Sequence, residues 1–253
     1  MDFFSFLASA AALAPWFEEF ARIGSAFGGE DPSALLPSLR AAGLKAEKAM
    51  LAATGGANTH KGLIFSLGTL CASAGILVAR GEALSGEACA KGASRILRGT
   101  TERDFAACRG KEEARLTVGE RLYLRWGATG IRGEAERGFP AVVRGSLPRL
   151  RAGLAAGMSL NDALVDDLLL LFTLVEDTNV LGRRGREGLD IVRAEARRAL
   201  SLGGVATEAG MAAIRAADTL FTAENISPGG CADLLAVTYF LWALSERLRP
   251  ATG

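Results

Sequence analysis

The sequence is poor in the side chains that most often bind transition metals. Its only histidine is His60, and its four cysteines, none of them in a C-x-x-C pair, are Cys71, Cys89, Cys108 and Cys231. A structural zinc site needs about four such ligands in a compact spacing. The sequence therefore argues against a classical zinc site and favours reduced core or interface thiols in a cytoplasmic protein.

Concentrated positive charge is also missing. The formal net charge is +1, no lysine- or arginine-rich tract occurs, and there are only two tyrosines. Proteins that bind nucleic acid or a membrane surface carry a basic patch or stripe. We therefore expect a small molecule or a protein as the partner, with no nucleic acid and no membrane, and we leave open a homodimer.

We expect no membrane span and no targeting peptide. A span needs about 18 to 20 consecutive apolar residues, and polar residues interrupt every apolar run. Residues 3–13 resemble the apolar part of a signal peptide, but Asp2 stands where a basic start is typical, and Pro15 and Glu18 follow as in an amphipathic helix. The sequence predicts a soluble protein.

Alternation of β-branched residues with period two is absent, and alanine, leucine, arginine and glutamate dominate. The sequence therefore predicts an all-α fold, with residues 1–253 as one multi-helix domain. Glycines at 62, 68 and 75 punctuate a helix expected at 58–79, which indicates a central helix with a closely crossing neighbour. Helix starts are predicted at Asp31-Pro32, Thr117 with Glu120, Ser159 with Asp162, and Ser227-Pro228.

Residues 54–62 (T-G-G-A-N-T-H-K-G) lie between two predicted helices and carry more polar groups than a connector needs. Gly55 and Gly56 allow backbone amides to approach a ligand, and the following helix directs its positive N-terminal end at the same place. Lys61 adds a cation. The segment is not a Walker A motif, because Gly62 follows the lysine and a helix precedes the loop. Phosphate binding and a simple capped interhelical turn both remain open.

An acidic segment at 175–181 (V-E-D-T-N-V-L) follows a strongly apolar predicted helix. Glu176 and Asp177 are placed by this prediction at the helix C-terminus, where the macrodipole disfavours negative charge. A Mg²⁺ ion that carries substrate phosphates would compensate. The alternative is a solvated acidic corner neutralised by Arg183 and Arg184.

Two more glycine-rich segments stand out. Residues 130–140 (G-I-R-G-E-A-E-R-G-F-P) alternate arginine and glutamate, and residues 227–233 (S-P-G-G-C-A-D) place a glycine pair at a helix start. Singly, Arg132 with Glu134 fits a surface ion pair, and Asp233 fits a residue that favours the helix dipole. Two Gly-Gly helix starts together favour two anchoring points for an elongated anionic ligand.

Together these four segments resemble the triphosphoribosyl-dephospho-CoA synthase family, through G-G-A-N-T-H-K-G at 55–62, G-I-R-G-E-A-E-R-G-F-P at 130–140, V-E-D-T-N-V-L at 175–181 and S-P-G-G-C-A-D-L-L-A at 227–236. The resemblance implies an all-helical enzyme that transfers triphosphoribose from ATP to 3′-dephospho-CoA and releases adenine. It also implies that the product is a prosthetic-group precursor for citrate lyase or malonate decarboxylase, passed to an acyl-carrier-protein holo-transferase.

That chemistry requires a clamp for the triphosphate and groups that move two protons. We expect catalytic roles for His60, Lys61, Glu134 and Asp177, with Mg²⁺ held by Glu176 and Asp177. Glu134 is the expected base for the attacking hydroxyl, and His60 either protonates adenine or binds phosphate. Substrate contacts are expected from Gly55, Gly56, Asn58, Thr59, Lys61, Arg132, Asn179, Ser227, Gly229, Gly230 and Asp233.

The start of the chain departs from the family pattern, which places K-P-G-L-V-like and G-A-H-x-D-M-like motifs further upstream. The apolar residues 3–13 open without an N-cap, so we expect a missing N-terminal segment and poor turnover. Two alternatives to the transferase remain: a Mg²⁺-dependent N-glycoside hydrolase, and a catalytically inactive helical subunit that binds a partner.

Overall fold

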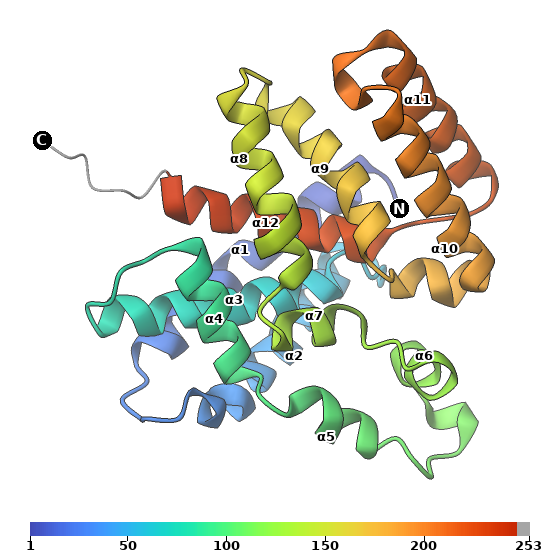
Figure 1. Cartoon of the computed structure of the whole chain (residues 1–253). Helices are drawn as coiled ribbons and strands as arrows, with labels where there is room; N and C mark the ends of the chain where they lie inside the picture. The colour runs from blue at the N-terminus through green and yellow to red at the C-terminus, as the bar shows by residue number, and fades with distance from the viewer. Residues whose placement is uncertain (247–253) are drawn as a thin grey trace, which may run out of the picture. The chain divides into compact units, whose positions relative to one another are not determined.

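The computed structural model describes residues 1–246, and all regular elements in that part of the chain are helices (Figure 1). The all-α prediction is confirmed. The described residues form two compact units: unit 1 contains Met1–Thr101, Ala135–Phe139 and residues 240–246, and unit 2 contains Glu102–Glu134 and Pro140–Tyr239. One domain over residues 1–253 stays a prediction, and residues 247–253 lie outside the described part.

The helices divide between the units as follows. Unit 1 holds α1 (Phe3–Ser25), η1 (Pro32–Leu35), α2 (Leu36–Ala53), α3 (Lys61–Ala79) and α4 (Gly86–Ile96). Unit 2 holds η2 (Glu113–Arg115), α6 (Val118–Trp126), η3 (Val142–Ser146), α8 (Leu147–Ala155), α9 (Leu160–Leu174), α10 (Thr178–Ser201), η4 (Gly204–Ala206) and α11 (Glu208–Ala223). Both units receive residues from α5 (Thr100–Ala106), α7 (Gly130–Glu136) and α12 (Gly229–Glu246).

Small residues let α1 and α3 cross closely in unit 1. A Cβ atom at Gly68 would lie 2.8 Å from the Phe20 ring, and one at Gly75 would lie 2.1 Å from the carbonyl oxygen of Ala21. On α1, a Cβ atom at Gly24 would lie 2.0 Å from the carbonyl oxygen of Ala72. The predicted close crossing is confirmed, although the helix begins at Lys61 and not at residue 58.

The same helix is longer and more apolar than the sequence argument about membrane spans allowed. By length and composition α3 could cross a membrane, with a mean hydropathy of 2.0 and 67% of that window buried inside the protein. Glycines, serines and a threonine interrupt the apolar run of this helix, but small neutral residues do not prevent an apolar average. Their burial against α1 and α4 makes α3 a core helix.

Helix caps in both units follow the sequence signals. Thr117 and Glu120 form the predicted capping box, Ser159 accepts the Asp162 amide, and Asp31 caps the turn that begins at Pro32. The last predicted start is displaced by one residue, because α12 begins at Gly229. All four cysteines are free and buried, as expected for core thiols.

The beginning of α1 differs from the expectation of an uncapped start. The Asp2 carboxylate accepts the Ser5 amide at 2.8 Å and completes a capping box. Of the apolar residues at 3–13, Leu13 is buried, whereas Phe3 and Phe4 are 70% and 74% exposed. The sequence signal was missed because serine, and not glutamate, fills the third helical position.

In unit 2, Asp167 of α9 is a buried acid without hydrogen-bond partners. The side chain is fully buried, and neither carboxyl oxygen has a partner. Burial raises the pKa of Asp167 to about 7, against the lowering effects of the Arg149 charge and the nearby Ser146 hydroxyl. A buried carboxyl without a well-formed hydrogen bond is held more cheaply in its neutral form.

We predict that Asp167→Asn changes the pH dependence of stability. Because folding raises this pKa to about 7, from about 3.9 in an unfolded chain, the wild type loses stability as pH rises from about 4 to about 7. The free energy of unfolding of the variant, measured with urea at each pH, should gain on the wild type by on the order of 2 to 4 kcal/mol between pH 4 and pH 8. Parallel curves would contradict the prediction.

Candidate functional site

The N-termini of α10 and α12 meet at one carboxylate in unit 2. Asp177 is the N-cap of α10, and its Oδ1 accepts the amides of Asn179 and Val180 at 2.8 and 3.2 Å. Its Oδ2 accepts the amide of Cys231, near the start of α12, at 2.8 Å. The acidic segment and the Ser-Pro-Gly-Gly segment, 54 residues apart in sequence, therefore belong to one cluster.

This geometry corrects the sequence interpretation of Asp177. Helix α9 ends at Leu174, and Asp177 begins the next helix instead of ending the previous one. A carboxylate at an N-terminus is favoured by the macrodipole and by the free amides. The short turn at residues 175–177 was not recognised in the sequence, and the argument that Asp177 needs a cation for that reason is wrong.

Glycines allow three motif segments to approach one another here. A Cβ atom at Gly230 would lie 3.0 Å from Asp177 Oδ2, and one at Gly229 would lie 3.0 Å from the side-chain nitrogen Nδ2 of Asn179. Gly130, which has a φ of 53°, would place a Cβ atom 2.9 Å from the Thr178 side chain. The predicted contact residues Asn179, Gly229 and Gly230 are thus neighbours of Asp177, and Ser227 lies just before them in the chain.

The cluster also contains a second acid. Asp233 lies two residues beyond Cys231 on α12, and burial together with the nearby Asp177 raises the pKa of Asp233 to about 7. Burial raises the pKa of Asp177 too, against the lowering effect of its three amide donors. Burial, followed by the Asp177 charge, raises the pKa of the Cys231 thiol well above its usual range. Two desolvated carboxyls therefore share one small region.

The donors fit a magnesium ion only in part. Asp177 and Asp233 supply neighbouring carboxyl oxygens, the ligand type that Mg²⁺ prefers, whereas Glu176 is exposed. Within residues 1–246 no group of three or more His, Cys, Asp or Glu side chains is arranged around a metal position. Mg²⁺ commonly takes one or two carboxylates and completes its shell with water and phosphate oxygens. The cluster suits that mode and does not form a protein cage.

In unit 1, the Gly55–Gly56 pair ends α2. The Gly56 amide donates to the Leu51 carbonyl at 2.8 Å, and Gly55 has a φ of 62°, which together form a Schellman motif. Both glycines are exposed, and a Cβ atom at either would meet nothing within 4 Å. The Asn58 side chain accepts the amide of Lys61, the first residue of α3, at 3.1 Å, while His60 is the N-cap residue. Much of this segment therefore has a structural explanation.

The charged and polar side chains of this loop have partners in unit 1. The Lys61 ammonium pairs with Glu47 at 2.5 Å while its side chain remains 58% exposed. His60 Nδ1 contacts the Ser9 hydroxyl at 2.7 Å, and Thr59 donates to the same hydroxyl at 2.7 Å. Burial lowers the pKa of His60. A phosphate at this loop would compete with Glu47 for Lys61.

The Gly130–Pro140 segment carries the remaining predicted side chains. Arg132 pairs with Asp104 at 3.4 Å, and its guanidinium carbon lies 5.9 Å from the centre of the Phe105 ring. Glu134 is half-buried and accepts the Ala141 amide at 3.2 Å. The sequence indicated a surface ion pair between Arg132 and Glu134, and the structure shows Arg132 paired with Asp104. Glu134 stabilises the turn after α7.

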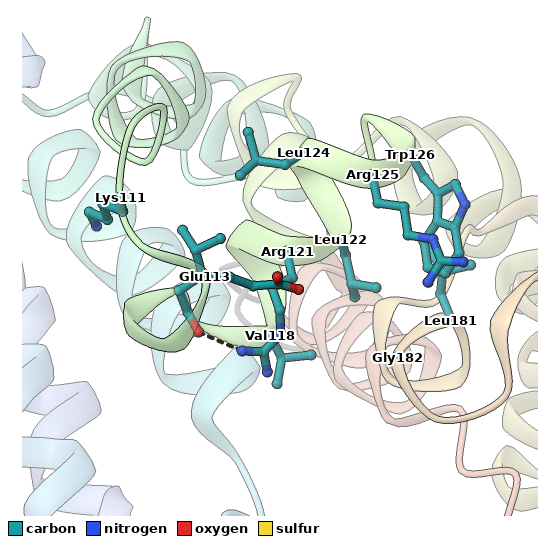
Figure 2. A pocket seen from close by; sticks show the side chains of 11 residues that line it. Lys111, Glu113, Val118, Arg121, Leu122, Leu124, Arg125, Trp126, Leu181 and Gly182 are labelled. Carbon is teal, nitrogen blue, oxygen red and sulfur yellow. Dashed lines mark hydrogen bonds between the residues drawn. The ribbon is translucent and has the colours of Figure 1, made fainter.

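A hollow of about 550 Å³ opens beside α6 and the first turns of α10 in unit 2 (Figure 2). Its volume lies within the range of small-molecule sites, about 300 to 1,000 Å³. Figure 2 shows Arg125 beside Trp126, and the guanidinium lies 4.5 Å from the ring centre. Apolar and basic side chains both line the hollow: Lys111, Glu113, Leu116, Val118, Arg121, Leu122, Leu124, Arg125, Trp126 and Leu181, with Gly182.

Comparisons with known proteins agree with this fold and these motifs. The family model CitG, described as ATP:dephospho-CoA triphosphoribosyl transferase, matches residues 1–251. A 2-(5″-triphosphoribosyl)-3′-dephosphocoenzyme-A synthase of Klebsiella pneumoniae is 42% identical over 243 residues, which are 96% of this chain and 80% of that protein. A protein of Citrobacter koseri with the same probable assignment is 41% identical over 238 residues, or 94% and 78% of the two chains.

The fold also matches a solved structure. The crystal structure of a candidate triphosphoribosyl-dephospho-CoA synthase from Archaeoglobus fulgidus superimposes with a TM-score of 0.62 over 95% of this chain and 99% of that one, at 20% identity. The two chains therefore share one all-helical fold over nearly their whole length. The chain belongs to the ATP:dephospho-CoA triphosphoribosyl transferase family.

Sequence reasoning missed several groups that the structure places in or near these clusters. Ser9 and Glu47 lie on α1 and α2, far in sequence from the His60 and Lys61 side chains that they contact. Asp104 similarly precedes its partner Arg132 by 28 residues. No local motif marks them, so only the packing of the helices reveals the pairs. Cys231, by contrast, stands inside a recognised motif and was passed over for its glycines.

We predict opposite outcomes for the two neighbouring acids of the 175–181 segment. Asp177→Ala leaves three amides without their acceptor, one of them buried in α12, and should lower the free energy of unfolding by on the order of 2 to 4 kcal/mol. Glu176→Ala removes an exposed side chain and should change it by less than about 0.5 kcal/mol. Urea unfolding followed by circular dichroism measures both, and equal effects would contradict the assignment of Asp177 as a structural cap.

Proposed function

We propose that this protein makes 2′-(5″-triphosphoribosyl)-3′-dephospho-CoA from ATP and 3′-dephospho-CoA with release of adenine. Family membership over residues 1–251 supports the reaction. The structural observation that carries the proposal is the meeting of three motif segments at Asp177, where two helix N-termini and two carboxyls face one region. One bond forms between the ribose C1 of ATP and the 2′-oxygen of 3′-dephospho-CoA while the bond from C1 to adenine breaks. The attacking hydroxyl therefore loses one proton and the departing adenine gains one.

Asp233 and Asp177 are the proposed holders of Mg²⁺. The ion, when bound, would offset the negative charge of the triphosphate and make ionised carboxyls acceptable in a desolvated place. Asp177 already accepts three amides, so it keeps its position whether or not the ion is present. Glu176 joins the set only as an exposed, outer partner.

For the remaining motif residues we keep the roles that their positions allow. Lys61, still 58% exposed beside Glu47, is proposed as a phosphate contact in unit 1, together with the Gly55 amide. The Gly56 amide already donates to the Leu51 carbonyl, so we propose no phosphate contact for it. Glu134 remains the proposed base. Arg132, paired with Asp104, is proposed to bind a phosphate by exchanging that partner.

The hollow beside α6 is the proposed place for the pantetheine arm of 3′-dephospho-CoA. That arm combines methyl groups and amides next to a pyrophosphate, and the hollow combines leucines, Trp126 and the cations Arg121 and Arg125. Leu181, which lines it, donates its amide to the Asp177 carbonyl at 2.9 Å. The hollow is therefore one helical turn from the proposed phosphate region, about 6 Å along the axis.

The wider setting follows the family resemblance. We propose that the product serves as the prosthetic-group precursor of citrate lyase or malonate decarboxylase and passes to an acyl-carrier-protein holo-transferase in the cytoplasm. A homodimer is part of the same proposal. Analytical ultracentrifugation of the 253-residue chain, with and without substrates, tests the oligomeric state directly.

The reaction and the metal are tested together by adenine release. The wild type should release adenine only when ATP, Mg²⁺ and 3′-dephospho-CoA are all present, and Asp233→Asn should lower kcat/KM for ATP by roughly tenfold or more. Asp218→Asn, at an exposed position on α11, is the matched control and should leave the substrate requirement and kcat/KM for ATP unchanged. Adenine release without 3′-dephospho-CoA would instead indicate an N-glycoside hydrolase, and ATP binding without turnover would indicate an inactive binding subunit.

A binding measurement separates the metal from catalysis. Mg²⁺ should increase the thermal stabilisation that ATP gives to the wild type, because the ion joins the triphosphate to the carboxyl pair. Asp233→Asn should lose this increment while keeping its helical circular dichroism spectrum. A variant with an undiminished Mg²⁺ increment would show that the pair does not hold the metal.

We predict that Leu124→Glu weakens the binding of 3′-dephospho-CoA and leaves the binding of ATP unchanged. Leu124 lines the hollow and is 46% exposed, so a glutamate there should be tolerated in folding and unfavourable for an apolar, anionic ligand. The KM for 3′-dephospho-CoA should rise on the order of fivefold to tenfold while the KM for ATP stays constant. Leu44→Glu on α2, at a residue that is 63% exposed, is the matched control. Equal behaviour of the two variants would place the arm elsewhere.

A further inference from the structure

Ser9 of α1 lies outside all four motifs, yet it contacts the loop before α3, which contains the only histidine of the sequence. The side chain is fully buried on α1. Its hydroxyl contacts His60 Nδ1 at 2.7 Å and accepts a hydrogen bond from Thr59 at 2.7 Å. A buried hydroxyl in contact with two polar side chains from another segment is a specific link, not a packing accident.

The hydrogen bonds that link Thr59, Ser9 and His60 indicate which ring nitrogen of the imidazole carries the proton. Thr59 donates to the Ser9 oxygen, so the Ser9 proton is free to be donated onward. Its neighbour is Nδ1 of His60, and when the Ser9 proton is donated to that nitrogen, Nδ1 is the acceptor. In a neutral imidazole only one ring nitrogen carries a proton, so that proton lies on Nε2.

Two further contacts hold the imidazole in place. The Phe6 ring meets it edge-on, with ring centres 5.4 Å apart and planes at 88°. The His60 amide donates to the Met50 sulfur at 3.3 Å. Burial lowers the pKa of His60, so the neutral ring predominates at pH 7. The ring is therefore oriented and uncharged before any ligand binds.

We propose that Ser9 is a positioning residue that keeps His60 as the neutral Nε2–H tautomer, and that His60 binds substrate as a hydrogen-bond donor through Nε2. Of the two roles left open by the sequence, binding is thereby favoured over protonation of adenine. A neutral Nε2–H group donates well to a phosphate oxygen or a ring nitrogen, but it has no second proton to give. The part of this inference that concerns substrate rests on the proposed function; the tautomer does not.

Nitrogen-15 NMR of the ring tests the tautomer without any substrate. The chain contains one histidine, so protein grown with ¹⁵N-labelled histidine gives one pair of ring nitrogen signals. A two-bond proton–nitrogen spectrum at pH 7 should show a protonated Nε2 and an unprotonated, hydrogen-bonded Nδ1. A protonated Nδ1 in the wild type would overturn the proposal.

Two variants locate the cause of the preference. Ser9→Ala should move the Nδ1 signal toward that of a ring nitrogen without a hydrogen bond and allow the second tautomer to appear. Thr59→Val removes the donor to Ser9 but leaves the Ser9 hydroxyl next to the ring. Because nothing then directs the Ser9 proton toward the ring, the Nδ1 signal should lie between those of the wild type and Ser9→Ala. Identical spectra for Ser9→Ala and the wild type would remove Ser9 from the role.

The donor role is tested by substitutions of the histidine itself. Glutamine can place an amide N–H near the position of Nε2, and alanine cannot. If His60 is a donor, His60→Gln should retain roughly five- to tenfold more kcat/KM than His60→Ala, the worth of one hydrogen bond. Equal losses in the two would overturn the donor role, because a proton-transferring histidine is replaced by neither residue. If neither variant loses activity while the wild-type ring signals are as expected, the placement of His60 at the substrate fails and the tautomer assignment stands.

Discussion

The arrangement of unit 2 depends on the hydrogen bonds that the Asp177 carboxylate accepts. The carboxylate accepts amides from the first turn of α10 and from the start of α12, so one side chain satisfies donors of two helices. Such a bridge requires the backbones to come close, and Gly229, Gly230 and Gly130 supply the space. The glycines of three motifs are thus explained by one geometric requirement. Any ligand of this region then meets helix ends that are already held in position.

The same arrangement creates an electrostatic imbalance. Burial and then the Asp177 charge disfavour ionisation of Asp233, and burial disfavours ionisation of Asp177. A structural bridge alone needs only one carboxylate, so the second acid has no evident role in stability. The proposed cation, shared with a polyphosphate, would give Asp233 a role in substrate binding, because it would lower the cost of charging both acids when the substrate binds. On that proposal, stability and substrate binding are opposed at Asp233 and aligned at Asp177.

Sequence reasoning succeeded where the chemistry is local. The all-α class, the Thr117–Glu120 capping box and the glycine-lined crossing of α3 each depend on residues within a few turns of one another. It failed at boundaries: the three-residue gap between α9 and α10 turned Asp177 from a supposed C-terminal acid into an N-cap. It also had no access to partners from distant helices, such as Glu47 for Lys61 or Ser9 for His60. The motifs located the region, but packing determined which role each side chain is free to play.

The close crossing of α1 and α3 bears on the chemistry of unit 1 in the same way. Gly68 and Gly75 allow α1 to lie directly against α3, and this contact determines where the earlier turns of α1 run. Ser9 and Phe6 lie on those turns, one accepting from Thr59 and the other meeting the imidazole edge-on. A glycine in the middle of a core helix thereby contributes to the orientation of a histidine at the end of that helix. Substituting Gly75 would act on His60 through α1 without touching the loop, because a Cβ atom there would lie 2.1 Å from the Ala21 carbonyl oxygen and force the helices apart.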